Sequence, residues 1–367
     1  MPLNSLSRFD CVHLGMDVSK HWIVVGVLEP DAGEAVVDKI AHDEPSVRRL
    51  IGRFPDRARL RACYEAGPTG YDLHRLLTAM GVACEVVAPS LIPKAPSERV
   101  KTDRRDARRL ARLHRVGELT AIRVPTVVEE GVRDLCRARA DVVEDRRRAR
   151  QRLSAFLLRH SRVFAGATAW TIKHREWLDR QRFDDPAVAA TYAHYLSVLE
   201  MRDSTMVAVD AELAGWFDRA PFAGPVSRLA AYRGVDRLGA LSLAAEVGDW
   251  RRFATAGAFT SFCGLVPSEY SSGERTRRGR LTNAGNVHIR TQLVEGAWAY
   301  QHRAAVPRHL AKRHEGVPLD TIARSWKAQQ RLCRRYQALA ARKDSTNTVA
   351  AAVARELAGF LWAEMQH

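Results

Sequence analysis

The sequence predicts an α/β plus all-α protein in three parts: a mixed-sheet domain over residues 1–120, a coiled-coil helical arm over 121–222, and a mainly helical domain over 223–367. Three observations lead to this fold class. Short β-rich runs alternate with amphipathic stretches up to residue 90, a 4-3 hydrophobic spacing begins at Val128, and helical patterns dominate after Ala223. The length of 367 residues also exceeds what one hydrophobic core usually holds.

The first part reads as β-β-β-α-β-α-β. The β-rich runs cover 12–19, 21–28, 35–40, 60–67 and 83–89, and the amphipathic helical stretches cover 45–54 and 70–80. If this order forms the usual mixed sheet, its first and fourth strands lie side by side. Residues 90–118 are then expected to be mainly helix, and Glu118 and Pro125 close the domain.

The arm is predicted from two seams of regularly spaced residues. The first seam is Val128, Val132, Leu135, Arg139, Val142, Arg146, Ala149, Leu153, Phe156 and His160, and the second is Tyr192, Tyr195, Leu199, Arg202, Met206, Val209, Leu213 and Trp216. A 4-3 spacing over about four heptads is typical of a coiled coil, and the two helices could pack antiparallel through the link at 163–187. The charged seam positions predict looser pairing or a polar partner. A plain helical hairpin inside one domain and an oligomer interface remain open alternatives.

The overall charge predicts a polyanionic partner. Lys and Arg number 58 against 42 for Asp and Glu, so the formal net charge is +16, and the excess is clustered. Clustering favours nucleic acid over the alternative of a generally basic surface. The sequence has no apolar run long enough to cross a membrane and its start lacks the pattern of a secretory signal, so a cytoplasmic protein is expected.

Cysteine usage gives no metal or disulfide signal. The six cysteines are scattered singly, without a CxxC pair or Cys/His ligand spacing. They are therefore interpreted as buried or idle thiols.

Four acids are the leading candidates for a metal site. Asp17 ends the first strand, Glu65 ends the fourth, and Asp103 and Asp106 share one helical face because residues i and i+3 are neighbours on a helix. Four carboxylates without His or Cys form a hard-oxygen set that suits Mg²⁺ or Mn²⁺, the ions that assist phosphoryl transfer.

The helix carrying two of these acids is also rich in cations. Arg104, Arg105 and Arg108 are candidate contacts to the phosphate backbone on which a metal would act. The alternative is that Asp103 is only a helix N-cap and that Asp106 only pairs with Arg109 along the helix.

A second candidate is the stretch Tyr270-Ser271-Ser272-Gly273. A serine hydroxyl beside glycine is expected to be uncrowded, and arginines nearby can hold a phosphate bidentately. The arginines that follow it are Arg275, Arg277, Arg278 and Arg280. This pattern suits a phosphoserine intermediate, although Ser-Ser-Gly is also an ordinary turn.

A third candidate is the segment "RGVDRLGALSLAAEVGDW", residues 233–250, which has the pattern of a degenerate helix-hairpin-helix. The amides of such a turn can contact phosphates without reading sequence. Asp236 stands where a second glycine would help, so plain helix packing is an equal alternative. The sequence contains no GxGxxG or GxxxxGK[ST] motif for nucleotide hydrolysis.

Four ordered motifs carry a family resemblance: "GMDVSK", "CYEAGPTGYDL", "VKTDRRDARRLARL" and "GLVPSEYSSGERTRRGRLTNAGN". In them the chain resembles the DEDD transposases of bacterial insertion sequences, a family of bridge-RNA-guided recombinases. The similarity extends through "RARQRLSAFLLRH" and "SWKAQQRLCRRY" to "ARELAGFLW", so it covers nearly the whole length. The resemblance implies a RuvC-like (RNase H-like) domain, a coiled-coil arm and a C-terminal transposase domain that bears a serine.

The resemblance also implies roles for individual residues. It makes Asp17, Glu65, Asp103 and Asp106 the metal ligands and Ser272 the nucleophile that leaves a covalent 5′-phosphoserine. The site would form between domains of different subunits, so a dimer or tetramer is expected. Donor and target DNA would be chosen by pairing with a structured non-coding guide RNA rather than by side chains.

Three functions follow as hypotheses. The leading one is an insertion-sequence transposase or DNA recombinase with Mg²⁺-dependent serine chemistry. The sequence departs from the pattern of the family at Asn283, where many relatives carry Lys. This difference removes one possible phosphate contact. The alternative is a RuvC-like, metal-dependent, structure-selective nuclease in which the acids cut DNA directly and Ser272 is a turn residue. The third is a non-enzymatic RNA-binding scaffold. The sequence leaves open whether Ser271 can replace Ser272.

Overall fold

The computed structural model describes residues 7–93, 102–269, 277–282, 284–343 and 345–367. The chain divides into two compact units, Met1–Val124 and Pro125–His367, which are described separately. The arm and the C-terminal helices belong together to the second unit, and the three-part division of the sequence remains a prediction. Among the described residues, every helix is too short or too polar to span a membrane.

The first unit contains a five-stranded mixed sheet. Its strands are β1 (Val12–Val18), β2 (Trp22–Leu28), β3 (Val36–Ala41), β4 (Leu60–Glu65) and β5 (Ala83–Val87). They lie in the order β3-β2-β1-β4-β5, in which β1 pairs antiparallel with β2 and parallel with β4. The predicted mixed sheet is confirmed, and so is the expected contact between the first and fourth strands.

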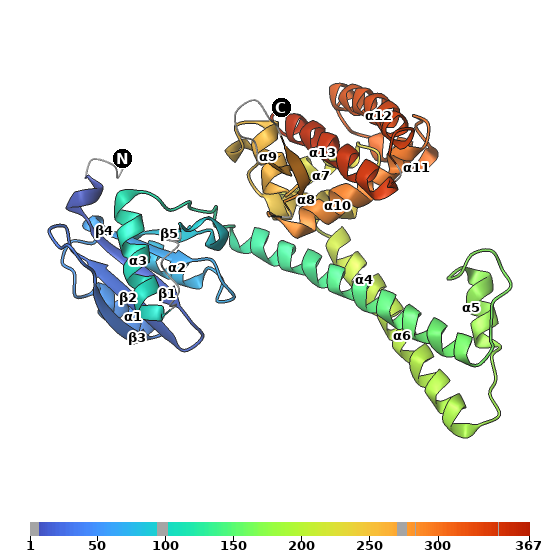
Figure 1. The fold of residues 1–367 in the computed structure, drawn as a ribbon, viewed down its shortest axis with the longest axis horizontal. Helices are drawn as coiled ribbons and strands as arrows, with labels where there is room; N and C mark the ends of the chain where they lie inside the picture. The colour runs from blue at the N-terminus through green and yellow to red at the C-terminus, as the bar shows by residue number, and fades with distance from the viewer. Residues whose placement is uncertain (1–6, 94–101, 270–276, 283, 344) are drawn as a thin grey trace. The chain divides into compact units, whose positions relative to one another are not determined.

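Helices cover both faces of this sheet because side chains alternate along each strand. Leu14 and Met16 belong to one buried cluster, together with residues of α1 (Glu44–Ile51) and α2 (Asp72–Ala79). The helix α3 (Asp103–Val116) crosses the opposite face, over β1 and β2 (Figure 1).

A pair of glycines lets α3 lie close to the sheet. Gly15 of β1 and Gly26 of β2 stand opposite each other in the strand register. A Cβ atom on either residue would collide with the backbone of α3, and at Gly26 it would lie 2.6 Å from the carbonyl oxygen of Ala107. Ala107 and Ala111 are fully buried at this contact. The two glycines therefore set the height of α3 above the sheet.

The arm is a hairpin of two long helices, α4 (Val127–Arg159) and α6 (Pro186–Ala214), with the short helix α5 (Ile172–Asp179) near its closed end (Figure 1). The helices run antiparallel. Arg139 of α4 pairs with Asp210 of α6, whereas Phe156, further along α4, stacks on Tyr192, which is earlier in α6.

The predicted seams mostly face the inside of this hairpin. The buried seam residues are Val132, Ala149, Leu153, Phe156, Tyr192, Leu199, Met206 and Leu213. The charged position Arg139 has the polar partner that the sequence predicted, namely Asp210. Val128 is an exception, because its side chain is exposed near the start of α4, and its assignment to the seam is wrong. Supercoiling of the pair remains a prediction.

The rest of the second unit is mainly helical. Its elements are α7 (Ala223–Ala230), α8 (Arg237–Val247), α9 (Ala256–Phe262), β6 (Pro267–Glu269), β7 (Arg278–Leu281), α10 (Val287–Ala297), α11 (Arg308–His314), α12 (Leu319–Ala340) and α13 (Thr346–Glu364). The apolar side of α13 lies in the main core of this unit, alongside residues of α8 and α10. The helices α12 and α13 end this unit, in agreement with the helical patterns predicted after Ala223.

The helix-hairpin-helix interpretation of residues 233–250 remains a prediction. The turn lies between α7 and α8, which pack against each other, and parts of it also contact other elements of the unit. Gly234 touches the backbone of Gly296 in α10, and the carbonyl oxygen of Val235 accepts a hydrogen bond from Arg313. Asp236 caps α8 by accepting a hydrogen bond from the amide of Gly239. The turn thus takes part in helix packing, and contact of its amides with phosphate remains a prediction.

Candidate functional site

Asp17 and Glu65 occupy neighbouring positions at the ends of two adjacent strands. The parallel pairing of β1 and β4 places Met16 opposite Tyr64. Asp17 and Glu65 are the next residues on their strands. Parallel strands point the same way, so both acids lie at the same edge of the sheet.

Both acids also belong to the face that α3 covers. Gly15 lies under the backbone of α3, and the thiol of Cys63 lies 3.7 Å from the carbonyl oxygen of Leu110 in α3. Because side chains two positions apart share a face of a strand, Asp17 and Glu65 project to the side of α3.

The direction of α3 brings its first turn toward these strand ends. His114, near the end of α3, stands beside His13 at the start of β1, and Ala107 lies over Gly15. The helix therefore runs opposite to β1. Its first turn, which carries the other two acids, extends toward the edge that holds Asp17.

Asp103 and Asp106 have different environments within that turn. Asp103 is the first residue of α3 and is exposed, whereas the N-cap is Thr102, so the N-cap alternative for Asp103 is wrong. Asp106 does pair with Arg109, at 3.2 Å between Oδ1 and Nη2. Its other oxygen, Oδ2, is buried and accepts no hydrogen bond from any described residue. The predicted salt bridge thus accounts for only half of this carboxylate.

The fit of these acids to a metal ion is partial. Within the described residues, no three His, Cys, Asp or Glu side chains form a group that could hold a metal ion. The four acids therefore do not form a closed ligand set in this structure. Their chemistry does suit Mg²⁺ or Mn²⁺, because carboxylate oxygens are the ligands these ions prefer and Oδ2 of Asp106 still needs a partner.

The buried thiol nearest to this edge is unsuited to chemistry. Cys63 is two residues before Glu65 on β4, and burial raises the pKa of its thiol. A thiol kept protonated is a poor nucleophile and a poor metal ligand. The carboxylates are therefore the reactive side chains of this edge.

The cations predicted to contact phosphate lie on the outer side of α3. Arg104 and Arg105 are exposed, and Arg108 is exposed while its Nε donates a hydrogen bond to the carbonyl oxygen of Ala35. Their positions on the same helix as Asp103 and Asp106 agree with a site that attracts a phosphate backbone.

The second candidate site falls largely outside the described residues. Ser271, Ser272 and Arg275 belong to the segment 270–276, which is not described, and Asn283 is not described either. In the sequence this segment joins β6 to β7, which pair antiparallel. The remaining predicted phosphate contacts lie after it: Arg277 and Arg280 are exposed, and Arg278 is the first residue of β7.

A hollow of about 930 Å³ borders this hairpin, and sequence reasoning did not find it. Its lining combines small residues of α9 and α13 with three arginines: Arg280 of β7, Arg335 of α12 and Arg355 of α13. Glu356 neutralises part of this charge through an ion pair to Arg335 at 3.0 Å. The run "RLCRRY" was the available signal. It indicates a helix, but it does not indicate that this helix borders the hairpin.

Comparison with known proteins identifies the family. A model described as "Transposase IS116/IS110/IS902 family" matches residues 226–313, and a DEDD transposase model of IS110 elements, described as "Transposase", matches residues 14–161. "Putative transposase y4qE" of Sinorhizobium fredii is 42% identical over 353 residues, which is 95% of this chain and 87% of the relative. The chain belongs to the IS116/IS110/IS902 family of transposases.

A second relative extends this result across a greater evolutionary distance. The "Transposase for insertion sequence element IS1533" of Leptospira borgpetersenii is 30% identical over 337 residues, which is 89% of this chain and 96% of that protein. The chain described by the structure is therefore an insertion-sequence transposase of the DEDD type, an enzyme that acts on DNA. The DEDD model implies an RNase H-like fold, in agreement with the mixed sheet of the first unit.

The family models cover the candidate residues but not the whole transposase. The DEDD model spans all four acids, and the other model spans the Ser-Ser-Gly segment. Residues 162–225, which include α5 and all of α6, lie between the two matches.

Proposed function

We propose that this transposase cuts and rejoins DNA through a phosphoserine intermediate, with Mg²⁺ held by the four acids and Ser272 as the nucleophile. The observation that carries the proposal is the placement of Asp17 and Glu65 at adjacent strand ends, on the face toward which the first turn of α3 extends. The unpartnered Oδ2 of Asp106 supports a cation at this edge.

Ser272 and two arginines have different roles in the proposed reaction. The hydroxyl of Ser272 loses its proton as Oγ attacks the scissile phosphorus, the P–O3′ bond breaks, and the released 3′ oxygen takes up a proton. A 3′ hydroxyl of the exchange partner then attacks the phosphoserine, which joins the new strand and restores the serine. Arg277 and Arg280 bind the phosphate through their guanidinium groups.

The metal ions have a limited and separate role. When bound by Asp17, Glu65, Asp103 and Asp106, Mg²⁺ supplies positive charge that stabilises the oxygens of the phosphate in the transition state. The choice of DNA sequence is assigned to a structured non-coding RNA of the element, which pairs with donor and target DNA. The protein would act as a dimer or tetramer, so that acids and serine of different subunits can form one site.

A covalent-trapping experiment tests the serine. Purified transposase is incubated with element-end DNA, the guide RNA and Mg²⁺, and the products are separated on a denaturing gel. We expect a protein–DNA adduct with wild type and with Ser271→Ala, and none with Ser272→Ala. Ser271→Ala is the matched control because it changes the neighbouring hydroxyl only.

Other outcomes identify the competing functions. Free cut ends without an adduct, unchanged in Ser272→Ala, would show a RuvC-like nuclease instead. RNA binding without any metal-dependent cleavage would show a non-enzymatic scaffold. A fully active Ser272→Ala protein would refute the serine mechanism. Omitting the RNA tests guidance separately, because a guided enzyme loses cleavage of the correct site without it.

A further inference from the structure

Three arginines converge on one carboxylate near the closed end of the arm. Arg146 and Arg150 come from α4, Arg175 from α5, and the shared acid, Asp203, from α6. The closest contact is 2.5 Å, between Nη2 of Arg175 and Oδ2 of Asp203, and the other two arginines lie at 3.8 and 3.9 Å from Oδ1. This arginine cluster therefore has two positive charges more than its carboxylate can neutralise.

Two other ion pairs that join α4 to α6 are balanced. Arg139 pairs with Asp210, and Arg202 pairs with Asp145 at 3.4 Å, so each of these cations has an acid of its own. The surplus at Asp203 thus distinguishes it from these two pairs, although within α4 Glu144 is also shared, by the exposed Arg147 and Arg148.

Donor groups of the cluster also lack acceptors. Nε of Arg150 and Nη1 of Arg175 are buried and donate no hydrogen bond to any described residue. Buried N–H groups are normally satisfied, and an unsatisfied one marks a place for a ligand or solvent. Burial, together with the charges of Arg146 and Arg175, lowers the pKa of Arg150. An additional anion would relieve both the unmade hydrogen bonds and the repulsion.

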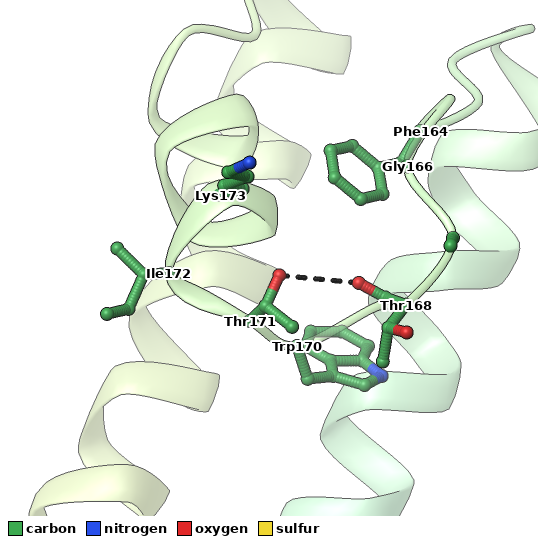
Figure 2. Close-up of a pocket in the computed structure, with 8 residues that line it drawn as sticks. Phe164, Gly166, Thr168, Trp170, Thr171, Ile172 and Lys173 are labelled. Carbon is green, nitrogen blue, oxygen red and sulfur yellow. Dashed lines mark hydrogen bonds between the residues drawn. The ribbon is translucent and has the colours of Figure 1, made fainter.

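An aromatic hollow lies next to the arginine cluster, because Trp170 lines the hollow and also contacts Arg150 of the cluster. The guanidinium carbon of Arg150 lies 4.9 Å from the centre of the Trp170 ring. Trp170 and Phe164 line an open hollow of about 680 Å³, with Thr168 and Thr171 on its wall and Lys173 beside it (Figure 2). The lining is therefore apolar and aromatic, with cations close by.

The backbone and a neighbouring histidine hold Trp170 in place. Its φ angle is 66°, a conformation that residues other than glycine rarely adopt, so the surrounding packing must maintain it. The ring of the buried His174 contacts both Trp170 and Phe164, each with ring centres 4.8 Å apart. Aromatic surface beside unneutralised guanidinium groups is the combination that binds single-stranded nucleic acid by base stacking and phosphate contact.

We propose that the hollow and the arginine cluster form one binding site for an unpaired nucleotide, whose base enters against Trp170 and Phe164 and whose phosphate contacts Arg150 and Arg175. The proposal rests on the proposed function only in taking nucleic acid as the polyanion. The site consists of residues of the arm, most of which lie between the two family matches, and it includes none of the four acids or the serine.

Binding of labelled oligonucleotides to the full chain tests the site. The probes are a single-stranded DNA and a single-stranded RNA of the same mixed sequence, about 20 nucleotides long, and the corresponding duplex DNA. Fluorescence anisotropy is measured over a range of salt concentrations in EDTA, so the result does not depend on cleavage. Failure of the cleavage proposal and failure of the binding proposal are therefore distinguishable.

Charge and aromatic variants should change different quantities. Arg150→Gln is expected to weaken single-strand binding about 5-fold or more and to lower the slope of log affinity against log salt by about 0.7, the value for one single-strand phosphate contact. Trp170→Leu is expected to weaken binding about 5- to 100-fold through lost stacking, with the slope unchanged.

Two more variants control for folding. Arg139→Gln makes the same substitution on the same helix but removes a balanced pair, so affinity and slope should equal those of wild type. Lys173→Gln changes an exposed side chain beside the hollow and should weaken binding without affecting the fold. Thermal unfolding gives a further readout, because Arg150→Gln relieves repulsion and should leave the melting temperature equal or higher.

Each outcome decides the proposal. A larger loss with RNA than with DNA assigns the site to RNA, and the reverse assigns it to DNA. Wild-type affinity for all three probes in Arg150→Gln, Trp170→Leu and Lys173→Gln would overturn the site. A change confined to duplex DNA would overturn the nucleotide assignment. A fall in melting temperature in Arg150→Gln with unchanged binding would show a purely structural ion network.

Discussion

The two ends of α3 use polar side chains in opposite ways. At its C-terminal end, His114 lies between His13 and Glu85, with 3.2 Å between the two Nδ1 atoms and 3.5 Å from Nε2 to the Glu85 carboxylate. Nε2 of His13 lies 2.8 Å from the carbonyl oxygen of Arg8, to which it donates. At the N-terminal end, Asp103 is exposed and Oδ2 of Asp106 is buried without a partner among the described residues.

The C-terminal end of α3 therefore has a structural role, whereas its N-terminal end is the candidate functional end. The histidine chain is closed: neutral His13 donates through Nε2, so its Nδ1 accepts the proton of His114 Nδ1. These hydrogen bonds contribute to stability and satisfy both ring nitrogens of His13. The acidic end lacks such hydrogen bonds among the described residues, so its carboxylate oxygens remain available, as expected of a site that binds a cation. The two ends therefore respond to different tests.

The largest expected effect is at the acidic end. We predict that Asp106→Asn lowers Mg²⁺-dependent strand cleavage about a thousandfold, because a metal ligand supports several kcal/mol of transition-state stabilisation. Stability should fall only slightly, since Asn keeps the size of the side chain but loses the charge that pairs with Arg109. The measurement is single-turnover cleavage together with a denaturation midpoint. Asp72→Asn, on the exposed acid of α2, is the control. Normal cleavage in Asp106→Asn would remove this residue from the site.

The histidine end should affect stability through pH. Burial is the main reason that the pKa of His13 is lowered to about 4, below an ordinary value of 6.5. Between pH 4 and pH 6.5 the unfolded chain binds more protons than the folded chain. The neutral His13 therefore contributes fully to the free energy of unfolding above pH 6.5, and this contribution is lost as the pH falls toward 4. Its size is about 3 kcal/mol.

Hydrogen exchange of the peptide that covers β1 measures this loss locally. Wild type should lose more protection than His13→Gln between pH 6.5 and 4, because Gln does not titrate. His21→Gln changes an exposed histidine of the same unit and should follow wild type. An identical pH response in wild type and His13→Gln would show that His13 is not the titrating group.

The smallest expected effect lies between the two ends, where the glycines hold α3 against the sheet. Gly26→Ala places a methyl group 2.6 Å from the carbonyl oxygen of Ala107, so we predict a destabilisation of about 1–3 kcal/mol. Cleavage should fall as well, because the displaced helix carries the acids of its first turn. Gly33→Ala is the control, since a Cβ atom there meets nothing within 4 Å. Equal urea midpoints for the two variants would contradict close packing at Gly26.

Local patterns were enough to predict much of this fold. Short β-rich runs predicted β1 and β4, and the strand order then placed Asp17 beside Glu65. The 4-3 spacing predicted the inward-facing residues of the arm and a polar partner for Arg139, although it wrongly included Val128. These features follow from the periods of helices and strands, which the sequence displays directly.

Features that join distant residues required the tertiary structure. No sequence pattern indicated that His13 would meet His114, or that Arg150 and Arg175 would share Asp203. The buried, unpartnered oxygen of Asp106 was equally hidden, and the role of Ser272 still rests on the family resemblance.

The amino-acid sequence by itself determined the periodic elements of the sheet and the arm, the four candidate acids and the family of this transposase. The tertiary structure decided which charges are balanced and which are left in excess. The physical reason is that periodicity depends on neighbours along the chain, whereas neutralisation and hydrogen bonding depend on neighbours in space.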